Sequence, residues 1–423
     1  MRISGMRWAA VLAATTMVLA AGCGQAPTAT GSAGGSAVPD NPAFGAANPA
    51  TGSPVRIGLF NGEGNPLADQ PAVGDAAIAA AQYANDHLGG LGGHRIEIDR
   101  CADKSDPAVA RACADQFVRD GVAAVVVGQP ATADAIVPTV VGAGIPWVGT
   151  TPIASSETTS PDTFFFGAGF VGTLGGWAQY AKDVGYKNLV MFGVDTPVFA
   201  AAIDAQARPL FQRAGIELKL IPIPIAATDA TAAVKEALGE NPDAVAVLTD
   251  TTACRSVLSA LHTARADEPK LLTSACIDQA SIDKVGEQAV DNAVVFNVGD
   301  PTGDSPEAQL YRAVMQQYAP KLDPGGITLT GYLAMLGFVR AVNAGGLPDG
   351  DPVAPADVLK ALRGARDVPR PVGDSGTFSC DKSAMSTPAL KATVCTDELM
   401  YTTYTGGLPG RYGRISVGQI VNS

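Results

Sequence analysis

The chain has 423 residues, 47% of them hydrophobic, and a formal net charge of −12. This length exceeds that of one average domain and predicts two lobes of about 150 residues each, plus tails. The acidic balance and the lack of any basic run in the sequence argue against a nucleic-acid partner, because such partners require clustered Lys and Arg.

Residues 1–23 predict an export signal. Arg2 and Arg7 form a positively charged start, an apolar run extends from Trp8 to Ala21, and Ala20-Ala-Gly-Cys23 closes it. The run is too short to cross a membrane, which takes about 20 residues, so we interpret it as a cleaved signal. Its end resembles a bacterial lipobox, which implies that a lipid on Cys23 anchors the protein to the outer face of the cell membrane. The alternative is an ordinary secretory signal, and both interpretations predict an extracytoplasmic protein.

Residues 24–54 predict a disordered tether. They are rich in Gly, Ala, Pro, Ser and Thr, with only Val38 and Phe44 as larger apolar residues. Such a composition cannot bury a core of its own. Cleavage of the signal removes two arginines and no acidic residue, so the net charge of the mature chain changes from −12 to −14.

Six cysteines remain once Cys23 is set aside, an even number typical of an oxidising compartment. They fall along the chain as three near-neighbour pairs, and we expect the disulfides Cys101 with Cys113, Cys254 with Cys276, and Cys380 with Cys395. Each such loop closure contributes about 3 kcal/mol in the chain-entropy model. A metal site is the alternative, but the sequence has no CxxC motif and its three histidines are scattered, so we expect no metal.

The first lobe is predicted to alternate strands and helices. The run from Ala123 to Val127 is short, β-branched and bounded by glycine, as is typical of a parallel strand buried on both faces. Polar loops follow this strand and the next one, and the carboxyl ends of parallel strands face one crevice. We therefore expect half of a binding site there. The predicted strands are 55–60, 95–100, 123–127, 145–148 and 163–166, and the predicted helices are 74–87, 107–120 and 133–142.

A second alternating set predicts a second α/β lobe built as a parallel sheet with helices on both faces. Its strands are 188–194, 218–223, 244–249, 270–273 and 293–298, and its helices are 173–184, 199–214, 230–238 and 254–266. Two further helices, at about 306–318 and 327–344, need a core, so we expect the chain to cross back between the lobes. A small hairpin is expected around Gly376 to Thr396.

Several segments stand in a characteristic order along the chain. They are the first strand with its Gly-rich loop, Gln82-Tyr-Ala-Asn-Asp86, Cys101-Ala-Asp-Lys-Ser-Asp-Pro107, Gly144-Ile-Pro146, Thr151-Pro-Ile-Ala-Ser155, Asn241-Pro-Asp-Ala244 and Gly376-Thr-Phe-Ser-Cys-Asp381. In these features the chain, from Val55 to about Asp381, resembles the leucine-, isoleucine- and valine-binding family of periplasmic binding proteins. The resemblance implies the type I fold, an α/β fold of two doubly wound parallel-sheet lobes joined by a three-crossover hinge. The expected lobes are 55–166 with 299–345, and 167–298 with 346–423.

One motif points instead to an enzyme. Gly167-Ala-Gly-Phe-Val-Gly172 is a GxGxxG sequence before a helix, and Asp195 closes the next strand, as in a dinucleotide-binding fingerprint. The motif follows a complete sheet half, however, and the resemblance places a crossover there, where glycines would let the chain bend and Trp177 pack closely. With no GxSxG motif and no Ser/His/Asp arrangement either, we expect no cofactor and no catalysis.

The resemblance also implies which residues contact a ligand. In the first lobe, backbone groups and hydroxyls of two loops suit a carboxylate or another acceptor, without a cation. In the second lobe, Phe199 stands where the family has an aromatic residue with a hydroxyl. The expected contacts are Asn61, Gln129, Ala131, Thr132, Ala154, Ser155, Asp195, Phe199, Asp250 and Asp278.

Amino-acid binders of this family place an acid near Cys276 to pair with the ligand ammonium, whereas Ala275 and Cys276 stand here. Asp278 and Asp250 are the alternatives for that role. Burying an ammonium without a partner is costly, so we do not expect a standard branched-chain amino acid as the ligand.

We expect a monomeric, lipid-anchored solute-binding protein that delivers a small polar molecule, namely an amino acid, amide or organic acid, to an ABC permease. The alternative is a ligand-sensing module for a membrane signalling partner, and neighbouring permease or kinase genes would discriminate between them. The sequence does not name the ligand.

Overall fold

The computed structural model describes residues 41–64, 69–152, 154–348, 350, 352–373, 376–387 and 390–422. The predicted signal, Cys23 and the first part of the predicted tether lie outside the described residues. Two sheets organise the chain from Asn41 onward.

The first sheet has six strands in the order β13-β5-β4-β3-β1-β2, and all neighbours are parallel. Its strands are β1 (Gly52–Asn61), β2 (His94–Ala102), β3 (Ala124–Val127), β4 (Trp147–Gly149), β5 (Thr163–Phe165) and β13 (Thr393–Val394). Alternate residues of β3 enter the cores on opposite faces of the sheet, so Val126 packs in one core and Val125 in the other. This double burial explains why the strand is a continuous apolar run.

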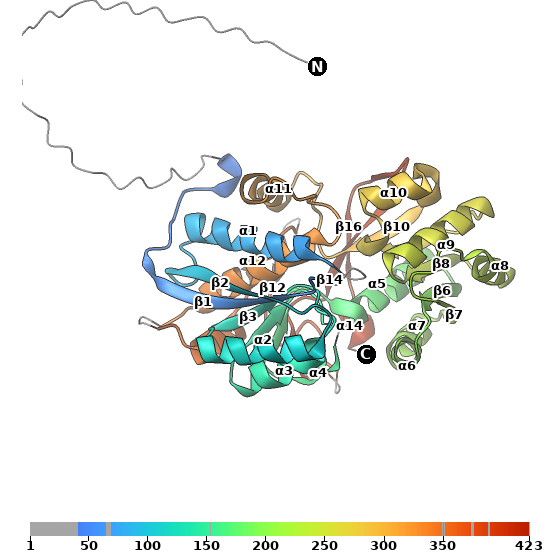
Figure 1. Cartoon of the computed structure of the whole chain (residues 1–423). Coiled ribbons are helices and arrows are strands. Elements are labelled where there is room, and N and C mark those ends of the chain that lie inside the picture. Colours follow the sequence, from blue (N-terminus) through green and yellow to red (C-terminus); the bar gives the residue numbers. More distant parts are fainter. Residues whose placement is uncertain are drawn as a thin grey trace, which may run out of the picture. The chain divides into compact units, whose positions relative to one another are not determined.

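Helices cover both faces of the first sheet. Side by side on one face lie α1 (Pro71–His87) and α12 (Thr328–Gly345), and on the other lie α2 (Pro107–Asp120) and α3 (Ala133–Gly142), as Figure 1 shows. Helix α1 approaches α12 so closely that a Cβ atom on Gly331 would lie 1.8 Å from the Val73 carbonyl oxygen. Only glycine fits at that crossing. The helices α11 (Pro306–Tyr318) and α13 (Pro355–Gly364) complete the core that α1 and α12 share.

The second sheet is mixed, with the order β15-β14-β10-β9-β8-β6-β7 and with β16 paired to β14. Its parallel strands are β6 (Asn188–Val194), β7 (Glu217–Ile223), β8 (Ala244–Leu248), β9 (Lys270–Thr273) and β10 (Ala293–Asn297). Antiparallel strands β14 (Glu398–Thr405), β15 (Leu408–Pro409) and β16 (Gly413–Ser416) extend it beyond β10.

Two groups of helices pack on the second sheet in separate cores. One core contains α5 (Gly169–Val184), α6 (Pro197–Ala202), the π-helical segment η2 (Ile203–Ala207), α7 (Arg208–Ala214) and α14 (Gly418–Val421). The other contains α8 (Thr231–Gly239), α9 (Thr251–Thr263) and α10 (Gln279–Val285). The helix predicted over 199–214 is thus interrupted by a π-helical turn.

Three segments carry the chain between the sheets. We call them the first (166–168), second (298–305) and third (395–397) crossing segments, after their order in the chain; they link β5 to α5, β10 to α11, and β13 to β14. This arrangement confirms the predicted α/β fold of two sheets joined by three crossovers.

The GxGxxG motif lies on the first crossing segment and the start of α5. Gly169 has a φ of +68°, and a Cβ atom there would lie 2.8 Å from Cδ of Pro152. A Cβ atom on Gly167 would lie equally close, 2.8 Å, to the carbonyl oxygen of Thr150. These glycines therefore allow the backbone to turn and pack closely at the crossover, where a larger residue would not fit. Trp177, about two turns further along α5 than Gly169, is fully buried against Phe296.

The predicted disordered tether is wrong for its last part, residues 41–54. Residues Pro42–Phe44 form a 3-10 helix, and the Phe44 ring is buried against Tyr83, His87 and Tyr318. The backbone amide of Asn48 donates to the backbone carbonyl of Asp86, 3.2 Å away. The buried Phe44 ring and backbone hydrogen bonds of Asn48, Ala50 and Gly52 together hold this segment on the first lobe. The burial also lowers the pKa of the His87 imidazole.

The C-terminal region divides differently from the boundary expected at residue 346. Helix α13 packs in the first-sheet core because Val358 and Leu362 find apolar partners there, and β13 joins the first sheet, whereas β14 and β16 join the second. The hairpin expected around Gly376 to Thr396 is also wrong. Strand β12 (Thr377–Phe378) pairs with β11 (Val368–Pro369), while β13 pairs with β5.

All three predicted disulfides are confirmed: Cys101 with Cys113, Cys254 with Cys276, and Cys380 with Cys395. Each joins segments that are neighbours in the sequence and in space. The first ties the end of β2 to α2, and the second ties α9 to the 3-10 helix η3 (Ser274–Cys276) that follows β9.

Replacing Phe44 with alanine should lower the free energy of unfolding by about 3 kcal/mol, because the substitution leaves a cavity among three aromatic rings. The measurement is urea denaturation. Leu408→Ala is the control, since that side chain is 70% exposed, and it should change stability by less than about 0.5 kcal/mol. Equal effects of the two substitutions would mean that residues 41–54 do not pack in solution.

Candidate ligand-binding site

Asn61, at the end of β1, is fully buried and holds three segments together. Its Nδ2 donates to the Gln70 carbonyl (2.8 Å) and to Oε1 of Glu63 (2.9 Å), and its Oδ1 accepts from the Gln129 amide (3.1 Å). Both ends of the side-chain amide are therefore engaged within the protein. Asn61 positions the loop after β3 rather than offering a free group to a ligand.

A buried carboxylate organises the loop between β3 and α3. Asp103 is 0% exposed, and its Oδ2 accepts from the Ala131 amide and from Oγ1 of Thr132, both at 2.9 Å. Its Oδ1 accepts from the Ser105 amide at 2.8 Å. Three donors from two loops therefore converge on one buried carboxyl group. The structure thus brings Ala131 and Thr132 together around a residue that the sequence analysis did not select.

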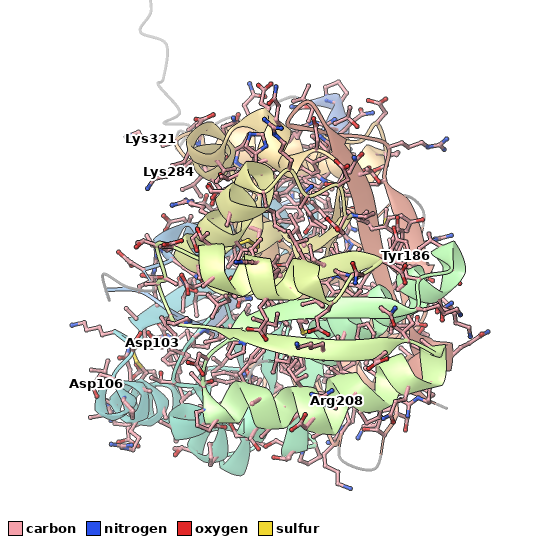
Figure 2. The ribbon with its side chains drawn as sticks, turned by 90° about the vertical axis from the view of Figure 1, so that its right-hand side faces the viewer. Asp103, Asp106, Tyr186, Arg208, Lys284 and Lys321 are labelled. Carbon is pink, nitrogen blue, oxygen red and sulfur yellow. A yellow bond between two sulfur atoms is a disulfide. The ribbon has the colours of Figure 1, made fainter. Side chains whose placement is uncertain are left out.

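Asp103 sits on a tight loop between β2 and α2. Lys104 and Ser105 both adopt positive φ, 51° and 52°, and Asp106 caps α2 by accepting from the Ala108 amide. Asp103 and Asp106 lie near one another at the start of α2 (Figure 2). The signal that could have identified Asp103 is the motif Asp103-Lys-Ser-Asp-Pro107, in which two acids flank a turn before a helix-starting proline.

The second predicted loop of the first sheet starts helix α4 (Ser155–Thr159). The Ala154 amide donates to Oε2 of Glu157 at 2.8 Å, and the buried Glu157 also accepts from the Trp147 indole at 2.8 Å. Ser155 is exposed. The Ser156 amide donates to Asp134 in the first turn of α3, so the starts of α3 and α4 adjoin. Thr132 gives no side-chain cap to α3, because its hydroxyl is committed to Asp103.

On the second sheet, Asp195 and Phe199 follow β6. Asp195 is exposed, and its amide donates to the Ile223 carbonyl at the end of β7. Phe199 is half-buried, and its ring lies so close to Gly193 that a Cβ atom there would meet it at 2.2 Å. The half-buried Phe170 ring lies edge-on to it, 6.3 Å between centroids. Phe170 was not predicted, although it lies within the GxGxxG motif.

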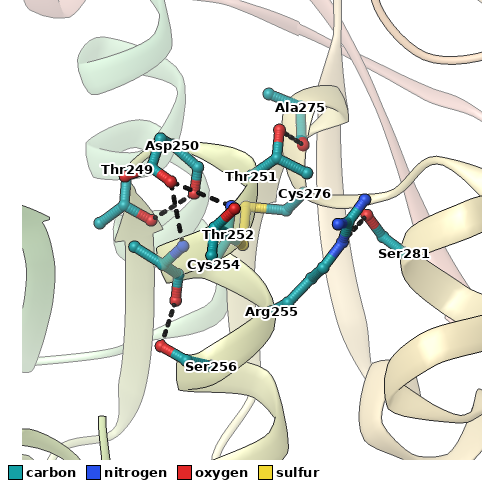
Figure 3. Close-up of a disulfide and its surroundings, with 11 residues drawn as sticks. Thr249, Asp250, Thr251, Thr252, Cys254, Arg255, Ser256, Ala275, Cys276 and Ser281 are labelled. Atoms are coloured by element: carbon teal, nitrogen blue, oxygen red, sulfur yellow. Dashed lines mark hydrogen bonds between the residues drawn. A yellow bond between two sulfur atoms is a disulfide. The ribbon is translucent and has the colours of Figure 1, made fainter. Parts of the chain in front are cut away.

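Asp250 follows β8 and is committed to backbone groups. Its Oδ1 caps α9 by accepting from the Thr252 and Ala253 amides, at 3.0 and 3.1 Å, and its Oδ2 accepts from the Ala226 amide at 2.9 Å. Figure 3 shows Asp250 at the start of α9, beside the Cys254–Cys276 disulfide. These bonds satisfy the carboxylate within the protein.

Asp278 is the other predicted alternative for an ammonium partner, and it too caps a helix. Its Oδ1 accepts from the Ser281 amide at 2.6 Å and lies 3.7 Å from the Arg255 guanidinium. Arg255 also donates to the Ser281 hydroxyl (Figure 3). Asp278 is therefore already paired with a cation of the protein, Arg255 on α9.

The ten predicted residues fall into groups on the two sheets. Asn61, Gln129, Ala131 and Thr132 are joined by hydrogen bonds directly or through Asp103, and Ala154 and Ser155 adjoin them through the start of α3. None of the ten lines a groove of about 320 Å³ that lies between α8, α9 and α10. That groove is bordered by polar side chains such as Thr252, Arg255, Ser259 and Lys284.

A family model described as periplasmic binding protein matches residues 54–394, which is most of the chain. The chain belongs to the periplasmic binding protein family. The match confirms the resemblance that the sequence motifs indicate. This is a family of solute-binding proteins, so the chain is not an enzyme. No curated protein matches the sequence.

Solved structures share the fold of this binding protein. The branched-chain amino acid transporter substrate-binding protein LivJ from Streptococcus pneumoniae, in complex with isoleucine, has a TM-score of 0.66 at 19% identity, over 86% of this chain and 99% of that one. An ABC transporter substrate-binding protein from Sphaerobacter thermophilus has a TM-score of 0.69 at 20% identity, over 86% and 98%. A solute-binding protein from R. palustris in complex with 4-hydroxybenzoate has a TM-score of 0.66 at 17% identity, over 86% and 97%.

The match to the family agrees with the predicted extracytoplasmic location. In the part of the chain that the structure describes, no helix combines the length and the apolar character needed to cross a membrane.

Asp103→Asn should lower the free energy of unfolding by about 2 to 3 kcal/mol, because the introduced amide weakens charge-assisted hydrogen bonds to Ala131 and Thr132 and buries an extra donor. Urea denaturation measures the loss. Asp115→Asn, on the exposed face of α2, is the matched control and should be neutral within about 0.5 kcal/mol. A neutral Asp103→Asn would show that the carboxylate does not hold this loop.

Asp250→Ala should cost about 1 to 2 kcal/mol of stability through loss of the α9 cap. Asp250→Asn retains a capping oxygen and should keep most of that stability. Thermal and urea denaturation of the two variants test the difference. If Asp250→Ala were as stable as the wild type, the carboxylate would not be acting as a cap, and its assignment to a ligand would gain support.

Proposed function

We propose that the protein is an extracytoplasmic solute-binding protein of an ABC importer, held at the membrane by a lipid on Cys23. The observation that carries this proposal is the family match over residues 54–394, together with the three crossing segments that join the two sheets. Ligand binding would stabilise the closed state in proportion to its differential affinity for the closed over the open form.

The first-sheet loops support a ligand that presents an acceptor such as a carboxylate. Thr132 and Ser155 lie at the starts of α3 and α4, and α3 receives no side-chain cap. Asp103 accepts from the Ala131 amide, and Glu157 and Asp134 accept from the Ala154 and Ser156 amides at the start of α4. Amides at a helix start favour negative charge, so a ligand carboxylate would gain at the uncapped start of α3, without a cation.

The second-sheet loops support a ligand without an ammonium group. Asp250 is committed to three backbone amides, and Asp278 to Arg255 and a helix cap. A ligand ammonium would have to displace these partners, pair with the exposed Asp195, or remain unpaired at a high cost. The half-buried rings of Phe170 and Phe199 would suit an apolar or aromatic body. We therefore propose an organic acid or amide, a class that includes the 4-hydroxybenzoate bound by the R. palustris protein of the same fold.

Ligand-dependent shifts in melting temperature should separate two acids that differ only in the ammonium. We expect 4-methylpentanoate to stabilise the protein at a lower concentration than leucine, and 3-(4-hydroxyphenyl)propanoate to do so at a lower concentration than tyrosine. Thr132→Val should weaken binding of the best acid at least tenfold, about 1.4 kcal/mol or more, because it removes the hydroxyl bond to Asp103 that positions the start of α3.

Thr139→Val, on the exposed face of α3, serves as the control and should leave affinity unchanged. Micromolar binding of leucine or valine with weaker binding of the deaminated acids would contradict the proposed ligand class. If no amino acid, amide or organic acid of the panel binds, the proposed function itself is wrong.

A further inference from the structure

A short hairpin reaches all three crossing segments. We call residues 368–373 and 376–380, which contain β11 and β12, the hinge clasp; its side chains Val368, Val372 and Phe378 belong to the first-sheet core. The Phe378 ring lies against Phe166 of the first crossing segment, with 5.2 Å between ring centroids. The clasp is thus anchored in the first-sheet core and contacts the first crossing segment.

The second crossing segment is bound to the clasp mainly through backbone groups. Arg370 Nη2 donates to the Val298 carbonyl at 2.9 Å, and the Asp300 amide donates to the Val372 carbonyl at 2.9 Å. The Ser305 hydroxyl donates to the Gly373 carbonyl at 3.1 Å. The contacts therefore span this segment from one end to the other.

The third crossing segment is bound at its start, where the Cys380–Cys395 disulfide joins it to the clasp covalently. The residue that follows the segment, Glu398 at the start of β14, is bound as well. Arg370 Nη1 lies 3.2 Å from Oε2 of Glu398, and Arg370 Nη2 donates to the Glu398 carbonyl, also at 3.2 Å. One guanidinium therefore bridges the second crossing segment and the start of β14.

The burial of Arg370 makes this bridge costly to break. Its side chain is only 2% exposed, and a buried cation that loses its partners pays a large desolvation penalty. Nearby, Val372 holds a φ of +54°, which β-branched residues avoid unless the surroundings enforce it. A rotation that moves the second sheet, in which β10 and β14 are paired, away from the clasp would have to break the Arg370 contacts.

We propose that the hinge clasp sets the range of motion between the two lobes, with Arg370 as the positioning residue that keeps the crossing segments in register. The inference rests on the proposed function in one respect, namely that the lobes move relative to one another. It does not depend on which solute binds.

The test measures lobe separation in the ligand-free exported protein. Spin labels on non-natural residues introduced at the exposed positions Arg111 on α2 and Lys235 on α8 would avoid the disulfide cysteines. Double electron–electron resonance then gives the distribution of distances between the labels. Arg370→Gln should at least double the width of this distribution, and Arg370→Lys should lie between it and the wild type, because an ammonium cannot bridge the same acceptors.

Arg366→Gln is the matched control. Arg366 pairs with Asp381 at 3.2 Å in the same C-terminal region, and it is half-exposed. This variant should keep the wild-type distribution. If Arg370→Gln fails to fold, Glu398→Gln carries the test, with Arg414→Gln as its control, since Arg414 is the other cation near Glu398, at 3.6 Å.

If the distance distributions of Arg370→Gln and Glu398→Gln both had the wild-type width, the proposed role of the clasp would be wrong. Equal broadening in the control variants would also show it to be wrong. A broadened Arg370→Gln in a protein that binds no solute of the panel would keep the clasp and refute the proposed function. Normal solute binding with no broadening of the distance distribution would support the proposed function and refute the clasp.

Discussion

The Asp103 carboxylate is the interaction on which the first half of the site depends. It lies at the end of β2 but holds the loop after β3, because it accepts from the Ala131 amide and the Thr132 hydroxyl. Asn61, at the end of β1, holds the same loop from the other side through the Gln129 amide. Three adjacent parallel strands therefore fix one loop, and the start of α3 is placed by buried hydrogen bonds rather than by its own cap.

The second sheet uses its acids in the same way. Asp250 and Asp278 each cap a helix, and Asp278 also faces Arg255. A carboxylate near a pocket is often read as a partner for a cationic ligand, but here each is already satisfied by groups of the protein. Neither Asp250 nor Asp278 is therefore free to pair with a cationic group of a ligand.

Sequence reasoning predicted the fold where short-range patterns decide it. The strands Asn188–Val194 and Lys270–Thr273, the helix Pro306–Tyr318 and all three disulfides follow from periodicity and from spacing along the chain. It missed β14, whose partner β10 lies a hundred residues earlier, since no local pattern records such a pairing. It also missed Asp103 and Arg370, because the sequence does not reveal which charged side chains become buried. The role of Phe44 was missed for a related reason, since one aromatic residue in a polar segment gives no periodic signal.

Strands β13 and β14 lie near the C-terminal end of the sequence, and their position affects when the protein can fold during synthesis. Strand β13 completes the edge of the first sheet beside β5, and β14 covers the edge of the second beside β10. Neither sheet is complete until the last tenth of the chain is available, so a growing polypeptide cannot reach the native state early. Contacts so distant in sequence also make folding slow. A chain that stays unfinished until its synthesis ends is well suited to passing through a membrane before it folds.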